Sequence, residues 1–138
     1  MMDDPAAALI SEVRAFIDDV NLGNMPAALA RLTRDVCIVE DIAPFRWTGP
    51  EAGSQWLAAM AANAERLGVT AIAMMPGEPR RVEVDGDRGY CIIPGRVTLQ
   101  GPEVALAEEG LITFAMRLEG GRWKIAALTW TGGEARPG

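Results

Sequence analysis

The sequence contains no histidine and only two cysteines, Cys37 and Cys91. Histidine and cysteine are the usual protein ligands of zinc and copper, and histidine is also the commonest general base. We therefore expect no metal site and no cofactor, and any acid–base chemistry falls to carboxylates, lysine, the single tyrosine Tyr90 or bound water. Both cysteines lie in apolar, strand-like runs, where a thiol usually behaves as a small buried hydrophobe, so we expect no disulfide.

Blocks of basic residues and long apolar runs are also missing. Thirteen basic residues stand against nineteen acidic ones, a formal charge of −6, and no basic cluster offers phosphate contacts, which argues against nucleic-acid binding. No apolar run approaches the roughly 20 residues of a membrane span, and the opening residues Met1 to Pro5 lack the basic region of a signal peptide. We expect a cytoplasmic protein without a membrane partner.

The length of 138 residues and the 49% apolar content fit one globular domain over residues 1–138. Helical periodicity predicts a first helix, with Asp4 as its cap, Pro5 at its first position and Gly23 as its terminating residue. Asn24 precedes a second, short helix. The segment Thr48-Gly49-Pro50-Glu51 has capping-box spacing and predicts a third helix that ends at Gly68. The apolar positions of the first helix are Leu9, Ile10, Val13, Phe16, Ile17 and Val20.

After Gly68 the sequence pattern predicts strands separated by turn residues, at residues 69–75, 80–85, 88–99, 104–118 and 122–131. Three helices followed by this meander predict an α+β fold. Alternation puts Ile112, Phe114 and Met116 on one face, and the same parity carries Glu108 there unless Gly110 marks a bulge. Because the sheet is covered by helices on one side and has apolar residues on the other, we expect a homodimer through its outer face.

The segment 35–45 carries the most chemical information, because an apolar strand runs directly into Glu40 and Asp41 and then Pro44. An acid at the end of a buried strand borders a dry cavity, so one reading makes Asp41 a base whose pKa is raised by apolar neighbours. The alternative is an aspartate that caps the turn before Pro44. Glu40, one residue earlier, is expected to face the opposite way, in solvent or in a salt bridge.

Several segments together resemble one known group. These are residues 16–24, residues 39–41 followed by Gly49, residues 94–97, and residues 121–123 leading to Trp130. Their order resembles the ketosteroid isomerase and SnoaL-like group of the nuclear transport factor 2-like superfamily. The resemblance implies a cone-shaped curved antiparallel sheet with three N-terminal helices packed on its concave side, and Asp41 in the place of the catalytic aspartate. The places of the two oxyanion donors hold Phe16 and Phe114, which cannot donate a hydrogen bond.

The resulting hypothesis is a protein that binds a small hydrophobic molecule in a cone-shaped pocket and catalyses a proton-transfer isomerisation, cyclisation or dehydration with Asp41 as base. The alternatives are a noncatalytic binding module and a dimeric protein-association domain whose cone is filled by its own side chains. Glu108 is a second pocket acid or, as we favour, a residue at the solvated end of its strand. Arg96 is expected in an ion pair at the surface or at the dimer interface rather than as a clamp for a ligand carboxylate or a partner for Asp41. The predicted ligand-binding residues are Phe16, Val39, Phe45, Trp56, Val97, Phe114, Met116 and Trp130.

Overall fold

The computed structural model describes residues 4–138, so Met1 to Asp3, which contribute to the signal-peptide reading, lie outside the described residues. The first half of the chain forms three helices and two strands, and the second half forms six strands, as the sequence predicts for its α+β character. The elements are α1 (Pro5–Asn21), α2 (Met25–Ala30), β1 (Leu32–Val39), β2 (Arg46–Thr48), α3 (Ala52–Arg66), β3 (Ala71–Pro76), β4 (Arg81–Asp85), β5 (Arg88–Gly101), β6 (Val104–Glu119), β7 (Arg122–Gly132) and β8 (Arg136–Pro137). The strands β2 and β8 were not predicted.

The strands form one curved sheet in the order β2-β1-β7-β6-β5-β3, with β4 on β5 and β8 on β6. All pairs are antiparallel except β1 and β7, which run parallel. The sheet is therefore mostly antiparallel, as predicted, with one parallel pair. A parallel pair needs a long crossover, and the chain between β1 and β7 supplies it with α3 and the meander.

The sequence predicts both ends of α1 correctly but not the start of α3. The Asp4 side chain accepts a hydrogen bond from the N–H of Ala6 at 3.0 Å, and Gly23 has a φ of 74°, as predicted. The predicted capping box of α3 is wrong. Thr48 pairs with Cys37 inside the sheet, and the N-cap residue is Glu51, whose side chain makes no cap hydrogen bond.

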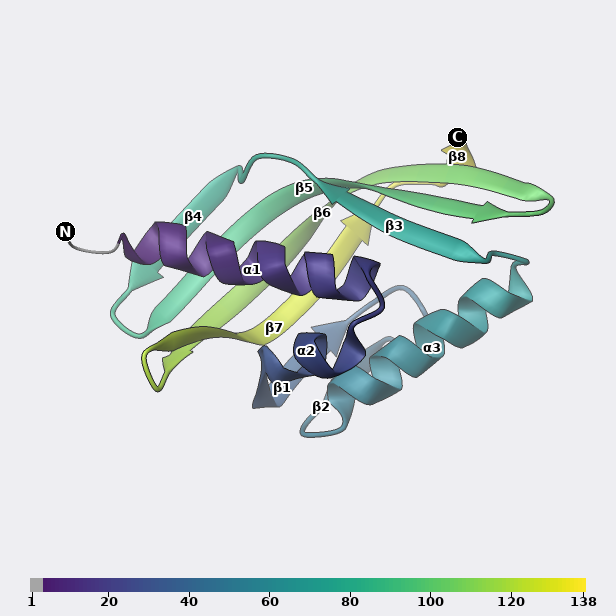
Figure 1. Ribbon diagram of the computed structural model, residues 1–138. Coiled ribbons are helices and arrows are strands. Elements are labelled where there is room, and N and C mark those ends of the chain that lie inside the picture. Colours follow the sequence, from purple (N-terminus) through teal and green to yellow (C-terminus); the bar gives the residue numbers. More distant parts are fainter. Residues whose placement is uncertain (1–3) are drawn as a thin grey trace.

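The helices cover the concave face of the sheet, and Figure 1 shows α1 lying across that face. Side chains of α1 pack on the alternate residues Ile112, Phe114 and Met116 of β6, which share one buried core with them. Phe16 stacks on Trp56 and meets Phe114 edge-on, each at a centroid distance of 6.2 Å. These three rings occupy the middle of the cone.

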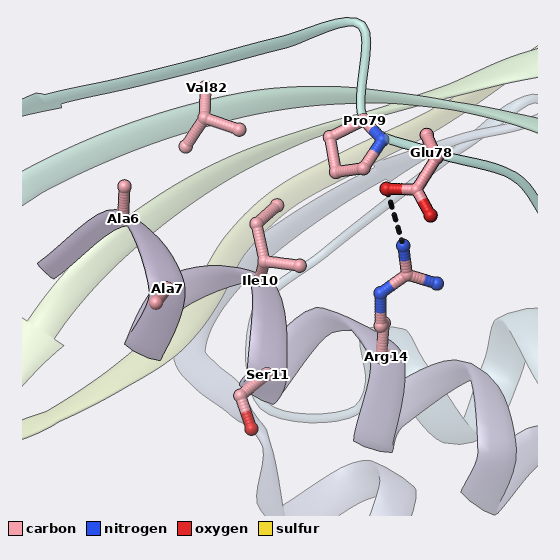
Figure 2. Close-up of a pocket in the computed structure, with 8 residues that line it drawn as sticks. All are labelled: Ala6, Ala7, Ile10, Ser11, Arg14, Glu78, Pro79 and Val82. Carbon is pink, nitrogen blue, oxygen red and sulfur yellow. Dashed lines mark ion pairs between the residues drawn. The ribbon is translucent and has the colours of Figure 1, made fainter. Parts of the chain in front are cut away.

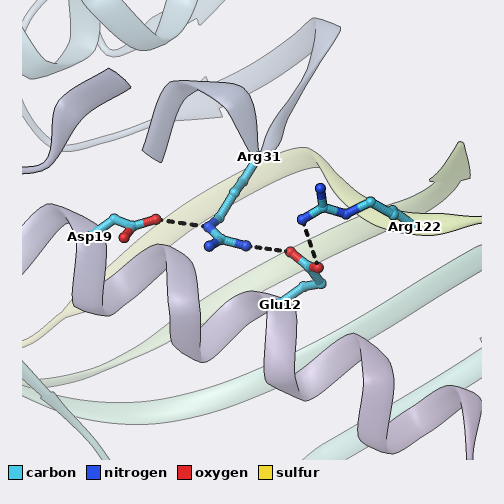
Figure 3. Close-up of polar contacts among 4 residues, drawn as sticks. All are labelled: Glu12, Asp19, Arg31 and Arg122. Carbon is cyan, nitrogen blue, oxygen red and sulfur yellow. Dashed lines mark hydrogen bonds and ion pairs between the residues drawn. The ribbon is translucent and has the colours of Figure 1, made fainter. Parts of the chain in front are cut away.

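A cluster of charged residues joins α1, the end of α2 and the start of β7 (Figure 3). Arg31 donates to Glu12 at 2.6 Å and to Asp19 at 2.8 Å, and Arg122 donates to Glu12 at 3.2 Å. The side chains of Arg31, Glu12 and Asp19 are mostly buried, whereas that of Arg122 is exposed. This cluster fixes α1 to the rest of the chain at its polar edge.

Both cysteines are free. Burial raises the pKa of the Cys91 thiol to about 12, consistent with its place in the core. Over residues 4–138 no helix is long and apolar enough to cross a membrane.

Candidate functional site

The end of β1 decides which of two adjacent carboxylates faces the interior. Val36 and Ile38 are 2% and 0% exposed, and Glu40 continues their alternation as a half-buried residue. Val39 is 42% exposed, and Asp41 is exposed. The expectation that Asp41 borders the dry interior is therefore wrong, and so is the expectation that Glu40 is solvated.

Glu40 is the carboxyl of this region with a raised pKa. Burial, followed by the negative charges of Asp41 and Glu108, raises its pKa from an ordinary value of 4.5 to about 7. Desolvation and like charge both disfavour the ionised form, so these causes act in the same direction. At neutral pH the Glu40 carboxyl is about half ionised.

Glu108 lies on the interior side and is held by an indole. Trp130 donates from Nε1 to Oε1 of Glu108 at 3.1 Å. The pairing of β5 with β6 continues without a shift through Gly95 and Gly110, so Gly110 forms no bulge in that pair and Glu108 keeps the face of Ile112. The preferred reading of Glu108 as a fully wet strand end is therefore wrong.

Three glycines lie side by side across the sheet next to this site. Gly95 pairs with Gly110, and Gly110 pairs with Gly132. A Cβ atom at Gly110 would lie 2.6 Å from the indole of Trp130 and 2.6 Å from the carbonyl oxygen of Thr131, and a Cβ atom at Gly132 would collide with the Glu108 carboxylate. The glycine row therefore leaves the space that the Trp130 ring and the Glu108 carboxylate occupy.

The turn that follows Glu40 is closed by its own backbone. The N–H of Glu40 donates to the carbonyl of Phe45 at 3.1 Å, and the N–H of Phe45 donates to Ile42 at 2.8 Å. Phe45 has a φ of 75° and its side chain is 58% exposed. Like Val39, it lies outside the apolar core, and the prediction that both residues bind a ligand stays a prediction.

The other predicted ligand-binding residues divide into two groups. Phe16, Trp56, Phe114 and Met116 are buried in the core, whereas Val97 and Trp130 are half-buried beside Glu108, with Val97 directly opposite it in the sheet. Glu40 was missed as an interior residue although Val36, Ile38 and Glu40 already share one parity in the sequence. The predicted surface ion pair of Arg96 is confirmed, with Glu109 at 3.2 Å.

A groove of about 620 Å³ lies away from this site, between α1 and the segment leading into β4. Figure 2 shows Ile10 and Val82 on its apolar side and the guanidinium of Arg14 facing Glu78 at 4.0 Å. Glu40 and the aromatic core do not line it. Among residues 4–138 no group of three or more histidine, cysteine, aspartate or glutamate side chains is arranged to hold a metal ion.

Comparison by sequence finds no relatives. No family model matches the chain, and no curated protein matches it.

Comparison by structure finds many similar chains. A scytalone dehydratase homologue from Novosphingobium aromaticivorans has a TM-score of 0.78 at 10% identity, covering 96% of this chain and 86% of its own. A type 2 hexachlorocyclohexane dehydrochlorinase, LinA, has a TM-score of 0.77 at 16% identity, covering 95% and 87%. A ketosteroid isomerase-like protein from Erwinia carotovora has a TM-score of 0.73 at 17% identity, covering 96% and 99%. These similarities show the nuclear transport factor 2-like fold, as the sequence resemblance implied.

Proposed function

We propose that this chain uses its nuclear transport factor 2-like fold to bind a small hydrophobic molecule and to move a proton on it, with Glu40 as the base. One observation carries the proposal: the alternation of β1 delivers Glu40 to the interior face, next to Glu108 and Trp130. A carboxyl that is half ionised near pH 7 is well suited to remove and return a proton at neutral pH. In this proposal Glu40 takes the role that the sequence assigned to Asp41.

The proposed step is a proton abstraction from a carbon next to a carbonyl group. The Glu40 carboxylate takes the proton, and the electron pair of the broken C–H bond moves into the carbonyl to form an enolate. With a β,γ-unsaturated carbonyl compound the enolate is conjugated, and return of the proton from the Glu40 carboxyl to the γ-carbon completes an isomerisation. With a β-hydroxy carbonyl compound the β-hydroxide departs as the carbonyl re-forms and takes the proton from the Glu40 carboxyl, which yields water and regenerates the base. No external oxidant or reductant is required in either case.

The neighbours of Glu40 have separate tasks in this proposal. Burial, and after it the charges of Asp41 and Glu108, raise the pKa of Glu40 and keep the base from being fully ionised. Trp130 holds Glu108 in place. Phe16 and Phe114 offer no hydrogen-bond donor for an enolate oxygen. Such a donor normally contributes about 10²–10³ in rate, so another group has to supply it. The buried N–H of Trp56, which has no partner within residues 4–138, is the donor available in the core.

The similar structures support the reaction class. The names of two of them, a dehydratase and a dehydrochlorinase, denote the loss of water and of hydrogen chloride, and a third is named ketosteroid isomerase-like. The fold alone does not select among these chemistries. The position of Glu40 is what favours proton transfer for this chain.

The test is deuterium incorporation from D₂O into a panel of enolisable cyclic ketones, including β,γ-unsaturated ones, followed by NMR. We expect exchange with the wild-type protein, its loss in Glu40→Gln, and its retention in Asp41→Asn, the adjacent matched control. Loss of exchange in Asp41→Asn with retention in Glu40→Gln would contradict the assignment of the base. If neither the wild-type protein nor the variants catalyse exchange and the protein still broadens the ligand signals, the result would favour a binding module.

A second candidate function is noncatalytic binding or protein association. The observation that favours it is the filled centre of the cone, where Phe16 meets both Trp56 and Phe114 and all three rings are almost fully buried. A ligand enters that space only if these rings move. Broadening of ring signals by a ketone without any exchange would support this function over catalysis.

A further inference from the structure

A second cleft lies at the opposite end of β1 from Glu40. It has a volume of about 420 Å³ and lies among the end of α2, the start of β1, the start of α3 and the β6–β7 turn. Thr33 and Glu40 are separated by seven residues, roughly 23 Å of extended strand. The cleft is therefore separate from the proposed catalytic site.

Two cations line this cleft without a counter-ion. Arg34 and Lys124 both line it, and neither forms an ion pair with another residue in the 4–138 range. The carboxylate that lines the cleft is Glu119, to which Arg117 donates at 2.9 Å. Arg117 also donates to nearby Asp35 at 2.6 Å. Free positive charge is thus concentrated here on a protein with a net charge of −6.

The start of α3 adds unpaired donors to the same place. Gly53 and Ser54 line the cleft, and their N–H groups have no acceptor within the described part of the chain. Glu51 makes no cap hydrogen bond, so these amides of the first turn remain available. Free N–H groups and the helix dipole at such a position favour an anion.

A buried hydroxyl without a partner lines the cleft as well. Thr33 is 3% exposed, and its Oγ1 finds no hydrogen-bond partner within residues 4–138. The Arg117 guanidinium, and after it the Thr33 hydroxyl, lowers the pKa of the neighbouring Asp35 carboxyl, so Asp35 is the protein group toward which this hydroxyl is directed, although the two do not meet the geometry of a hydrogen bond. Buried hydroxyls are normally paired, so this one marks a place where a polar group is missing.

The remaining wall is apolar. Leu29, Leu32 and Val36 line the cleft beside the cations, and its volume of about 420 Å³ exceeds what a lone carboxylate needs. We propose that the cleft binds a small organic acid, with its anionic group at Arg34, Lys124 and the start of α3 and its apolar part against the leucines. This ligand site is independent of proton transfer at Glu40.

The test uses hexanoate as the probe and hexanol as its neutral counterpart, in amide NMR titrations at constant ionic strength. We expect saturable shifts of the Gly53 and Ser54 amides with hexanoate and none with hexanol. Since a charge-assisted contact contributes about 1 kcal/mol or more, Arg34→Gln and Lys124→Gln should each weaken binding about fivefold or more. Arg88→Gln, which removes an exposed charge in the β4–β5 hairpin, and Glu40→Gln should leave binding unchanged.

A second measurement does not depend on the variants. Lys124 is the only lysine of the sequence, so reductive methylation followed by mass spectrometry reports on it directly, with the terminal amine as internal reference. Hexanoate should slow the modification of Lys124 relative to that reference. The proposal is overturned if hexanol shifts the same amides as strongly, if Arg88→Gln weakens binding as much as Arg34→Gln, or if Lys124 gains no protection.

Discussion

At the level of single residues, the central fact is that two adjacent carboxylates have different environments. Glu40 is half-buried with a pKa raised to about 7 by burial and by the charges of Asp41 and Glu108, whereas Asp41 is exposed. Between about pH 4.5 and 7 the native state keeps the Glu40 proton and the unfolded state releases it. Stability therefore falls as the pH rises through this window.

Replacing Glu40 with glutamine should stabilise the protein at pH 8 by about 1–3 kcal/mol. The upper figure is the free energy that corresponds to the full pKa shift, and the lower figure allows for solvent screening of this half-buried group. At pH 4 the carboxyl is protonated in both states, so the effect there should be close to zero. Urea unfolding at pH 4 and at pH 8 measures the change in the free energy of unfolding at each pH. Glu109→Gln, which removes an exposed carboxylate, is the control. An equal change at both pH values would show that the effect does not come from ionisation.

Glu108 should influence the titration of Glu40 directly. In Glu108→Gln one negative neighbour is lost, the ionised form of Glu40 becomes easier to reach, and its pKa should fall from about 7 toward 4.5. Burial is the larger cause and remains, so the fall should be partial. Carbon-13 NMR of the Glu40 carboxyl measures it, with Glu109→Gln as the neighbouring control. An unchanged pKa would mean that the Glu108 charge does not reach Glu40.

At the level of secondary-structure elements, α1 depends on partners far away in the sequence. Arg31 bridges Glu12 and Asp19 of α1, and these three side chains are mostly buried. Arg31→Ala leaves two carboxylates short of a partner and should lower the free energy of unfolding by about 1–3 kcal/mol. Arg81→Ala breaks the exposed pair with Glu83 and should change it by less than about 0.5 kcal/mol. Equal effects of the two variants in urea unfolding would argue against this role for Arg31.

The strands β5, β6 and β7 depend in a similar way on the glycine row. A methyl group at position 110 meets the Trp130 ring and the carbonyl of Thr131, so Gly110→Ala should destabilise the protein by about 1–3 kcal/mol. At Gly133 the nearest atom is 3.9 Å away, which makes Gly133→Ala the matched control. Thermal unfolding distinguishes the two. A neutral Gly110→Ala would indicate that the Trp130 ring has room to shift.

At the level of the whole molecule, the outer face of the sheet is unlike an ordinary solvated surface. Thr113 pairs with Ile92 on one side and Thr129 on the other, and these three residues are half-exposed. Their neighbours on this face are Tyr90, Pro94, Leu111, Ala115, Ala127 and Thr131. The proposal of a homodimer through this face rests on that uncharged composition.

Light scattering after gel filtration should therefore give a mass of about twice 14.8 kDa. Thr113→Arg places a charge at the centre of the outer face and should shift the protein to the monomer, because an unpaired charge in an interface is strongly unfavourable. Ser11→Arg on the helical side should leave the mass unchanged. A monomer at all concentrations, or a dimer that ignores Thr113→Arg, would exclude this interface.

The sequence by itself determined the three helices, the five longer strands of the meander, the Asp4 cap and the Gly23 terminus, because each depends on local periodicity or on one residue's backbone preference. Only the tertiary structure decided that β1 runs parallel to β7, that Thr48 belongs to a strand rather than a helix cap, and that Glu40 rather than Asp41 faces the interior. The parity of Val36, Ile38 and Glu40 was visible in the sequence, but a strand's last residue can turn either way. Burial, the charge of the adjacent Asp41 and the charge of Glu108 raise the pKa of Glu40. Burial and the approach of Glu108, a residue distant in sequence, arise only when the strands meet.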